Sequence, residues 1–227
     1  MIPNSAYILL IIITFIGMIV QSTLKQKFNK YGRKRLRAGY TGKEIAEMML
    51  ADHGINDVKV ISTPGALTDH YNPLKKTVNL SRPVYNSDSV AAAAVAAHEV
   101  GHAVQHAVGY RWLRLRSAMV PVVSFSSKIV MILLIVGIMM IKTFPKLLLI
   151  GIILFGLTVV FSFITLPVEY DASARAKKWL EEKGLVTPEE KEGVADALKW
   201  AARTYVVAAL SSLATLLYYL NIYNSRR

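Results

Sequence analysis

The segment Val95-Ala-Ala-His98-Glu99-Val-Gly-His102-Ala-Val104 determines what the rest of the chain must provide. Apolar residues that suit a helix lie on both sides of the two histidines, so we expect a helix here and not a loop. Histidines four residues apart lie about 6 Å apart along the helix axis, and both rings can reach one zinc ion. Such a site needs a third protein ligand, which the fold must bring from another segment.

Glu99 lies beside the first histidine, on a neighbouring face of the predicted helix. From that face its carboxylate reaches a water next to the ion instead of the ion itself, which is the position of a general base. A chance match in an alanine-rich helix is the alternative. The pattern favours a hydrolase site with Zn2+ as cofactor, His98 and His102 as metal ligands and Glu99 as the catalytic residue.

Hydrophobic residues make up 53% of the 227 residues, and they gather in blocks. Four blocks approach the about 20 apolar residues that cross a bilayer: residues 6–23, 121–141, 147–167 and 205–223. The first block is predicted to be a retained anchor, because its basic residues follow it and no small-x-small cleavage site separates them. We expect a mainly α-helical membrane protein with four transmembrane helices in contact with the lipid bilayer.

The net charge of +12 is uneven, and a dense basic run follows the first block at residues 25–37. Lysine and arginine beside a span are retained on the cytoplasmic side. This predicts a multi-pass protein of the cell inner membrane whose catalytic region is cytoplasmic. No nucleic-acid binding is expected, because neither interleaved aromatic residues nor a known binding motif accompanies the run. The absence of cysteine excludes disulfides and thiolate metal ligands.

Counting spans locates the third ligand. Two predicted spans separate the histidine helix from Val168, so Glu169 emerges on the same membrane face as His98, whichever way the protein is oriented. Glu169 is therefore the predicted third metal ligand, against the alternative of an acid placed at a helix start by the macrodipole. His106 lies about 12 Å from His98 along the helix, too far for one ion.

The predicted organisation has five regions. They are a transmembrane helix (1–24), a cytoplasmic zinc-helix region with a small sheet (25–116), a transmembrane helical hairpin (117–168), cytoplasmic helices with the third ligand (169–203), and a fourth transmembrane helix with the C-terminus (204–227). Within the second region we expect a helix from Thr41 to about His53, strands at 58–61, 67–71 and 77–80, and a helix at 89–108 capped by residues 86–88. Residues 77–80 are predicted as an edge strand that could hold an extended peptide.

Several nearby side chains could support the site. Asp171 could orient a ligand histidine through its second ring nitrogen, or it could pair with Arg175 one turn later. His106 is predicted to be a structural or supporting histidine. Candidate stabilisers of the transition state are His70, Tyr71 and Tyr170.

Three runs of residues resemble a known family: His98-Glu-Val-Gly-His-Ala-Val-Gln-His106, Leu67-Thr-Asp-His-Tyr-Asn-Pro73 and Leu166-Pro-Val-Glu-Tyr-Asp-Ala172. They are similar to the YugP-like neutral zinc metallopeptidases of bacterial membranes, and the likeness spans nearly the whole chain. More distantly they resemble the HtpX-like and CAAX prenyl proteases, gluzincins in which a later helix supplies a glutamate ligand. The resemblance implies His98, His102 and Glu169 as ligands and Glu99 as base. Those gluzincins usually carry an aspartate four residues after the ligand glutamate, where this chain has Ser173.

We therefore expect a gluzincin-like zinc metalloendopeptidase at the cytoplasmic membrane face, acting on a peptide or membrane-protein substrate. One alternative is an intramembrane site-2-type protease, which requires the motif within an apolar span. The other is a non-catalytic scaffold stabilised by zinc, which usually has four protein ligands. Small residues at 208–214 would allow close helix packing, within the chain or in an oligomer.

Overall fold

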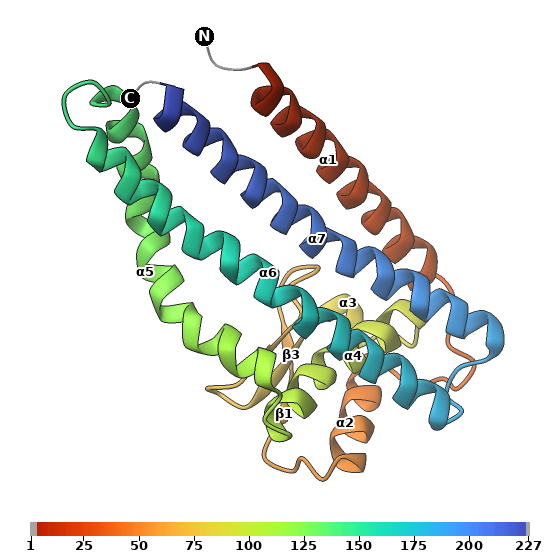
Figure 1. Ribbon diagram of the computed structural model, residues 1–227. Coiled ribbons are helices and arrows are strands. Elements are labelled where there is room, and N and C mark those ends of the chain that lie inside the picture. Colours follow the sequence, from red (N-terminus) through yellow and green to blue (C-terminus); the bar gives the residue numbers. More distant parts are fainter. Residues whose placement is uncertain (1–3, 226–227) are drawn as a thin grey trace. The chain divides into compact units, whose positions relative to one another are not determined.

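The computed structural model describes residues 4–225. In chain order the elements are α1 (Asn4–Gly32), α2 (Gly42–Asp52), β1 (Lys59–Thr63), β2 (His70–Asn72), β3 (Thr77–Ser81), α3 (Arg82–Tyr85), α4 (Val90–Ala107), α5 (Arg111–Met139), α6 (Pro145–Glu182) and α7 (Pro188–Ser225) (Figure 1). The chain divides into two compact units. The span unit comprises residues up to 21, 114–166 and from 203 onward, and the site unit comprises 22–113 and 167–202.

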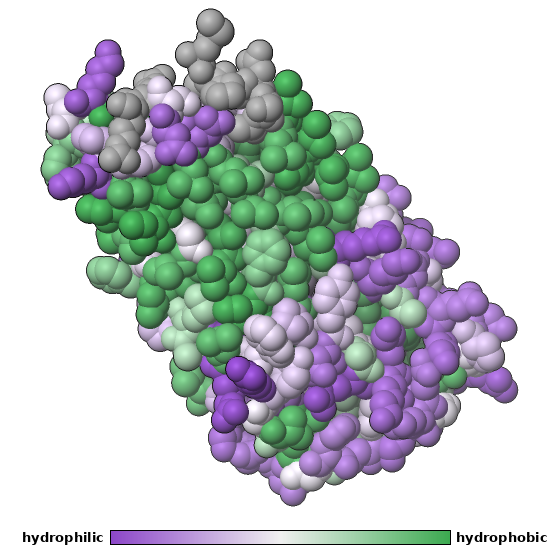
Figure 2. Space-filling model, viewed as in Figure 1, coloured by the Kyte–Doolittle hydropathy of each residue, from purple (hydrophilic) through white to green (hydrophobic). Residues whose placement is uncertain are grey.

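The span unit is built from four helices, α1, α5, α6 and α7, that are long and apolar enough to cross a membrane. Large apolar side chains such as Phe15, Phe125 and Ile153 are exposed on them. Figure 2 shows a broad, nearly unbroken hydrophobic surface over these helices. Such a surface suits contact with lipid instead of water. The prediction of a mainly helical membrane protein with four candidate spans is therefore confirmed.

Close backbone contacts hold the span unit together. A Cβ on Gly137 of α5 would lie 2.6 Å from the Cα of Leu148, so glycine permits the tight α5–α6 hairpin. The hydroxyls of Ser162 and Ser212 share a hydrogen bond of 3.0 Å between α6 and α7. Ala209 is buried on α7. Packing within the chain thus uses part of the small-residue segment noted in the sequence.

α6 extends far beyond its apolar block. It continues through Pro167 to Glu182 without interruption. Glu169 is therefore an interior residue of a long helix, and the alternative of an acid at a helix start is wrong. Since α6 belongs to the span unit as far as Leu166 and to the site unit from Pro167, one helix carries both a membrane span and the carboxylate.

In the site unit, α2 begins as predicted. The Thr41 hydroxyl accepts a hydrogen bond from the Glu44 amide, and the Glu44 carboxylate accepts one of 2.7 Å from the Thr41 amide. This reciprocal arrangement is a capping box. The helix ends before Gly54, whose φ of +67° suits glycine.

The three strands form a sheet in the order β1-β3-β2, with β3 parallel to β1 and antiparallel to β2. The prediction that residues 77–80 form an edge is wrong, because β3 pairs on both sides. Its continuous burial from Val78 to Ser81 agrees with that central place. The edges are β1 and β2. Strand β2 starts three residues later than predicted, because Leu67 adopts a positive φ of 58° that interrupts an extended run.

The segment after β3 also differs from the prediction. A short helix, α3, occupies residues 82–85, and the N-cap of α4 is Ser89 instead of residues 86–88. The Ser89 hydroxyl accepts a hydrogen bond of 3.2 Å from the Ala92 amide. All four adjacent residues from Asn86 to Ser89 have side chains that favour the N-cap position. Their residue types alone therefore do not show which of them caps α4.

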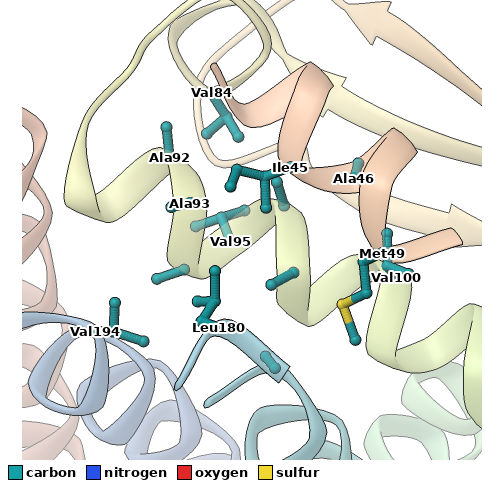
Figure 3. Packing of buried hydrophobic residues seen from close by; sticks show 14 of the residues in the cluster. Ile45, Ala46, Met49, Val84, Ala92, Ala93, Val95, Val100, Leu180 and Val194 are labelled. Atoms are coloured by element: carbon teal, nitrogen blue, oxygen red, sulfur yellow. The ribbon is translucent and has the colours of Figure 1, made fainter. Parts of the chain in front are cut away.

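α4 is the core of the site unit. Every residue of 90–105 except His98 is buried. Figure 3 shows Ile45 and Met49 of α2, Leu180 of α6 and Val194 of α7 packed around it. An alanine-rich sequence suits a helix surrounded on all sides, because its small side chains let neighbouring helices approach. The histidine motif consequently sits on the most constrained helix of the unit.

Candidate metal centre

The structure brings His98, His102 and Glu169 together. One carboxylate oxygen of Glu169, Oε2, lies 3.3 Å from His98 Nε2 and 3.6 Å from His102 Nε2. The three ligand atoms all lie within 4.8 Å of one another. Glu169 is only 2% exposed, and His102 is buried as well. Two imidazole nitrogens and one carboxylate oxygen at this spacing form a donor set typical of zinc.

A glycine within the motif allows this convergence. A Cβ on Gly101 would lie 2.7 Å from the carbonyl oxygen of Ala172, so the backbones of α4 and α6 are in direct contact. Ala172 and Ala176 are buried on α6, whereas Ala174 is exposed. Because a carboxylate side chain is short, this contact is what brings Glu169 within reach of the histidines.

Each histidine is held through its other ring nitrogen. His98 Nδ1 lies 3.1 Å from the Ser173 hydroxyl, and His102 Nδ1 lies 3.1 Å from Gln105 Oε1. Ser173 thus contacts His98 from the position four residues after Glu169. Hydrogen bonds of this kind fix the orientation and tautomer of a ligand histidine.

Gln105 links His102 to α6. This side chain is fully buried, and its amide nitrogen donates hydrogen bonds of 2.8 Å to the Val168 carbonyl and to the Asp171 carboxylate. Both partners only accept, so the amide oxygen must face His102, whose Nδ1–H then donates to it. The lone pair of His102 Nε2 is left facing Glu169. Gln105 was not predicted from the sequence, although a glutamine in an apolar helix three residues after His102 is an unusual residue that could have indicated this role.

Of the two arrangements that the sequence left open for Asp171, the structure of residues 4–225 shows the pairing with Arg175 and no direct contact with a histidine. Its carboxylate accepts a hydrogen bond of 2.6 Å from Arg175 Nε and the bond from Gln105. It therefore reaches His102 through Gln105 and not directly.

Glu99 is buried next to both histidines on α4. Burial raises the pKa of its carboxyl, and the negative charges of Glu169 and Asp69 raise it further, against the opposite effect of the two histidines. Burial lowers the pKa of His102, but the Glu169 carboxylate outweighs it and the net shift is upward. Glu99 therefore holds a proton more readily than an exposed glutamate does.

Of the remaining candidate side chains, two meet at the end of α4 and two are exposed. The Tyr71 hydroxyl lies 2.9 Å from His106 Nδ1, so β2 and the end of α4 meet there. Burial raises the pKa of Tyr71. His70 is exposed on the other face of β2, since side chains alternate along a strand, and its Nδ1 lies 2.9 Å from the Thr68 carbonyl. Tyr170 is 51% exposed.

Comparison with known proteins adds independent evidence. The family described as "Putative neutral zinc metallopeptidase" matches residues 6–224. The chain is also 44% identical over 207 residues to the "Putative membrane protease YugP" of Bacillus subtilis (strain 168), and the alignment covers 91% of each chain. No solved structure matches. Because both similarities extend over nearly the full length, the chain belongs to the YugP-like family of neutral zinc metallopeptidases.

Proposed function

We propose that this membrane protein is a zinc metalloendopeptidase in which His98, His102 and Glu169 hold the ion and Glu99 is the general base. The convergence of three ligand atoms within 4.8 Å carries the proposal. The hydrogen bonds that join the outer ring nitrogens to the side chains of Ser173 and Gln105 support it, because they turn both Nε2 atoms toward Glu169.

A zinc ion in such a site supplies Lewis acidity, which makes a water more acidic and polarises a peptide carbonyl. Glu99 accepts the proton of the attacking water and later delivers it to the leaving amine. Its burial and raised pKa suit a carboxyl that holds this proton between the two steps. Of the candidates for stabilising the oxyanion, Tyr71 has the best support, because its hydroxyl lies beside α4 next to His106.

Two other functions have less support. Among residues 4–225, three ligands converge at this cluster, whereas a structural zinc site usually has four. An intramembrane protease would carry the motif in a span, but α4 is not among the four span candidates. We place the site at the cytoplasmic face of the inner membrane, because the basic run at residues 25–37 follows the apolar part of α1.

The decisive experiment is the Glu99→Gln variant of the full-length protein. Zinc content, measured by elemental analysis, should remain stoichiometric, because Glu99 is not a ligand. Hydrolysis of casein or of fluorogenic peptides should fall at least about 100-fold, because the glutamine side chain cannot take the proton that Glu99 is proposed to accept. Glu47→Gln, which removes an exposed acid on α2, serves as the control. A Glu99→Gln protein that still cleaves peptides at the normal rate would contradict the assignment.

A further inference from the structure

A cleft of about 390 Å³ lies within the site unit, away from the three metal ligands, and none of the proposed functional residues lines it. Its walls come from the end of α1, the loop before β2, α3 and the first turn of α4. We term it the α1–α4 cleft. Its lining residues are Lys25, Phe28, Asn29, Gly32, Arg33, Ala66, Leu67, Asp69, Ser81, Pro83, Val84, Ser87, Ser89, Ala91 and Ala92. This volume lies in the range of small-ligand and side-chain pockets.

The cleft shares a helix face with the metal centre. Ala91 precedes His98 by seven residues, and Ala92 precedes Glu99 by seven, which is two turns in each case. The cleft is thus displaced from the reacting groups by about 10 Å along α4. An extended peptide covers that distance in about three residues.

The cleft combines an apolar wall with two cations. Val84, Ala91 and Ala92 form the wall on the side of α3 and α4, while Lys25 and Arg33 lie eight residues apart on α1. Residues at this spacing share one helix face. Neither cation has an ion-pair partner among residues 4–225, whereas neighbouring Lys27 pairs with Asp196 at 2.7 Å.

The acidic residue of the cleft is already engaged. Asp69 accepts hydrogen bonds from the amide and hydroxyl of Ser81, at 2.7 and 3.0 Å. Its carboxylate is therefore fixed to β3, and it forms no ion pair with Lys25 or Arg33 in the described structure. The positive charge at the α1 side of the cleft remains available to an incoming anion.

We propose that the α1–α4 cleft binds the substrate about three residues from the scissile bond, with an apolar side chain against Val84, Ala91 and Ala92 and an acidic residue near Lys25 and Arg33. This inference rests on the proposed peptidase function and specifies its substrate class: apolar segments flanked by Asp or Glu. Charge complementarity selects this occupant, because the two cations have no other counter-charge in the described part of the chain.

The test uses a series of fluorogenic peptides with one common apolar core. Asp, Gln or Lys is placed two to four residues from the cleaved bond, on either side. The full-length protein in phosphatidylcholine nanodiscs should show a kcat/KM at least about 10-fold higher for the best Asp peptide than for its Lys counterpart. The double variant Lys25→Glu, Arg33→Glu should reverse this preference. The double variant Lys30→Glu, Lys34→Glu carries the same charge change outside the cleft and should keep the wild-type preference.

A third variant tests the apolar wall. Ala66→Trp adds a large side chain at an exposed loop position of the cleft, where it does not disturb the core. It should raise the KM for peptides with Phe or Leu at the matching position and leave peptides with Ala there unaffected.

A binding measurement separates failure of this inference from failure of the proposed function. Labelled peptides are titrated onto the Glu99→Gln variant, with and without the charge reversal, and binding is followed by fluorescence anisotropy. Charge-dependent peptide binding without hydrolysis by any zinc-loaded protein would support peptide binding in the cleft and contradict the proposed peptidase function. Hydrolysis by the double variant with an unchanged Asp preference would contradict the cleft alone. If the charge-reversal variant bound phosphatidylglycerol vesicles more weakly but kept the wild-type peptide preference, the two cations would contact lipid headgroups and the proposal would be overturned.

Discussion

At the scale of single residues, the site depends on groups that do not touch the substrate. An apolar residue at position 105 would remove hydrogen bonds from three polar groups: His102 Nδ1, the Val168 carbonyl and the Asp171 carboxylate, the last of which keeps its bond from Arg175. His102 and Val168 are buried, and an unmet hydrogen bond in such an environment costs about 1–3 kcal/mol. Gln105 is thus a positioning residue for His102.

Gln105→Leu should therefore weaken zinc binding by about 10- to 100-fold, because His102 loses the bond that sets its tautomer. The measurement is a competition titration against a zinc chelator, which needs no substrate. Gln26→Leu makes the same substitution at an exposed position of α1 and should leave zinc affinity unchanged. Equal zinc affinities for wild type and Gln105→Leu would show that Gln105 does not position His102 for zinc binding.

At the scale of elements, the metal centre requires that two helices touch. The 2.7 Å approach of a Cβ at position 101 to the Ala172 carbonyl involves backbone, which cannot rotate away as a side chain can. Any residue larger than glycine must push α6 from α4. Glu169 then moves away from both histidines, since it is carried on α6 itself.

Gly101→Ala should destabilise the site unit by about 1–3 kcal/mol through overpacking and should reduce bound zinc. Thermal unfolding and metal analysis of the purified protein measure the two effects. Gly156→Ala is the matched control, because a Cβ at Gly156 of α6 meets nothing within 4 Å. Normal zinc content in Gly101→Ala would show that α6 does not need this close contact to place Glu169.

At the scale of the whole molecule, a bound ion would couple segments far apart in sequence. His98 and His102 lie on α4 and Glu169 on α6, so an ion held by these three residues would bind the folded site unit and not the unfolded chain. A ligand that binds only the folded state raises its stability by about 4 kcal/mol at a concentration 1,000 times its Kd.

Removal of zinc with EDTA should therefore lower the Tm, and added zinc should restore it in proportion to the logarithm of its free concentration. The shift should disappear in Glu169→Ala, which lacks one ligand, and persist in Glu182→Ala, which removes an exposed acid of the same helix. Differential scanning fluorimetry in detergent measures both. A zinc-dependent Tm in Glu169→Ala equal to that of wild type would argue against Glu169 as a ligand.

Much of the fold followed from local pattern. The four spans, the capping box at Thr41 and the histidine helix each depend on residues close together in sequence, and their periodicity or cap chemistry indicates them directly. The pairing of β3 in the centre of the sheet did not follow. Strand order depends on which segments meet in three dimensions, and the sequence of a five-residue strand does not indicate which strands pair with it.

The sequence by itself determined the chemistry available to this protein: two histidines and a glutamate at helical spacing, no thiolate, and four apolar segments that require a membrane. Only the tertiary structure decided which distant groups meet them. It placed Glu169 against both histidines, Ser173 and Gln105 behind the two rings, and an apolar cleft with two cations two turns along the same helix. The physical reason is that local interactions select helices, whereas these contacts depend on close approach between backbones, as at Gly101 and Ala172.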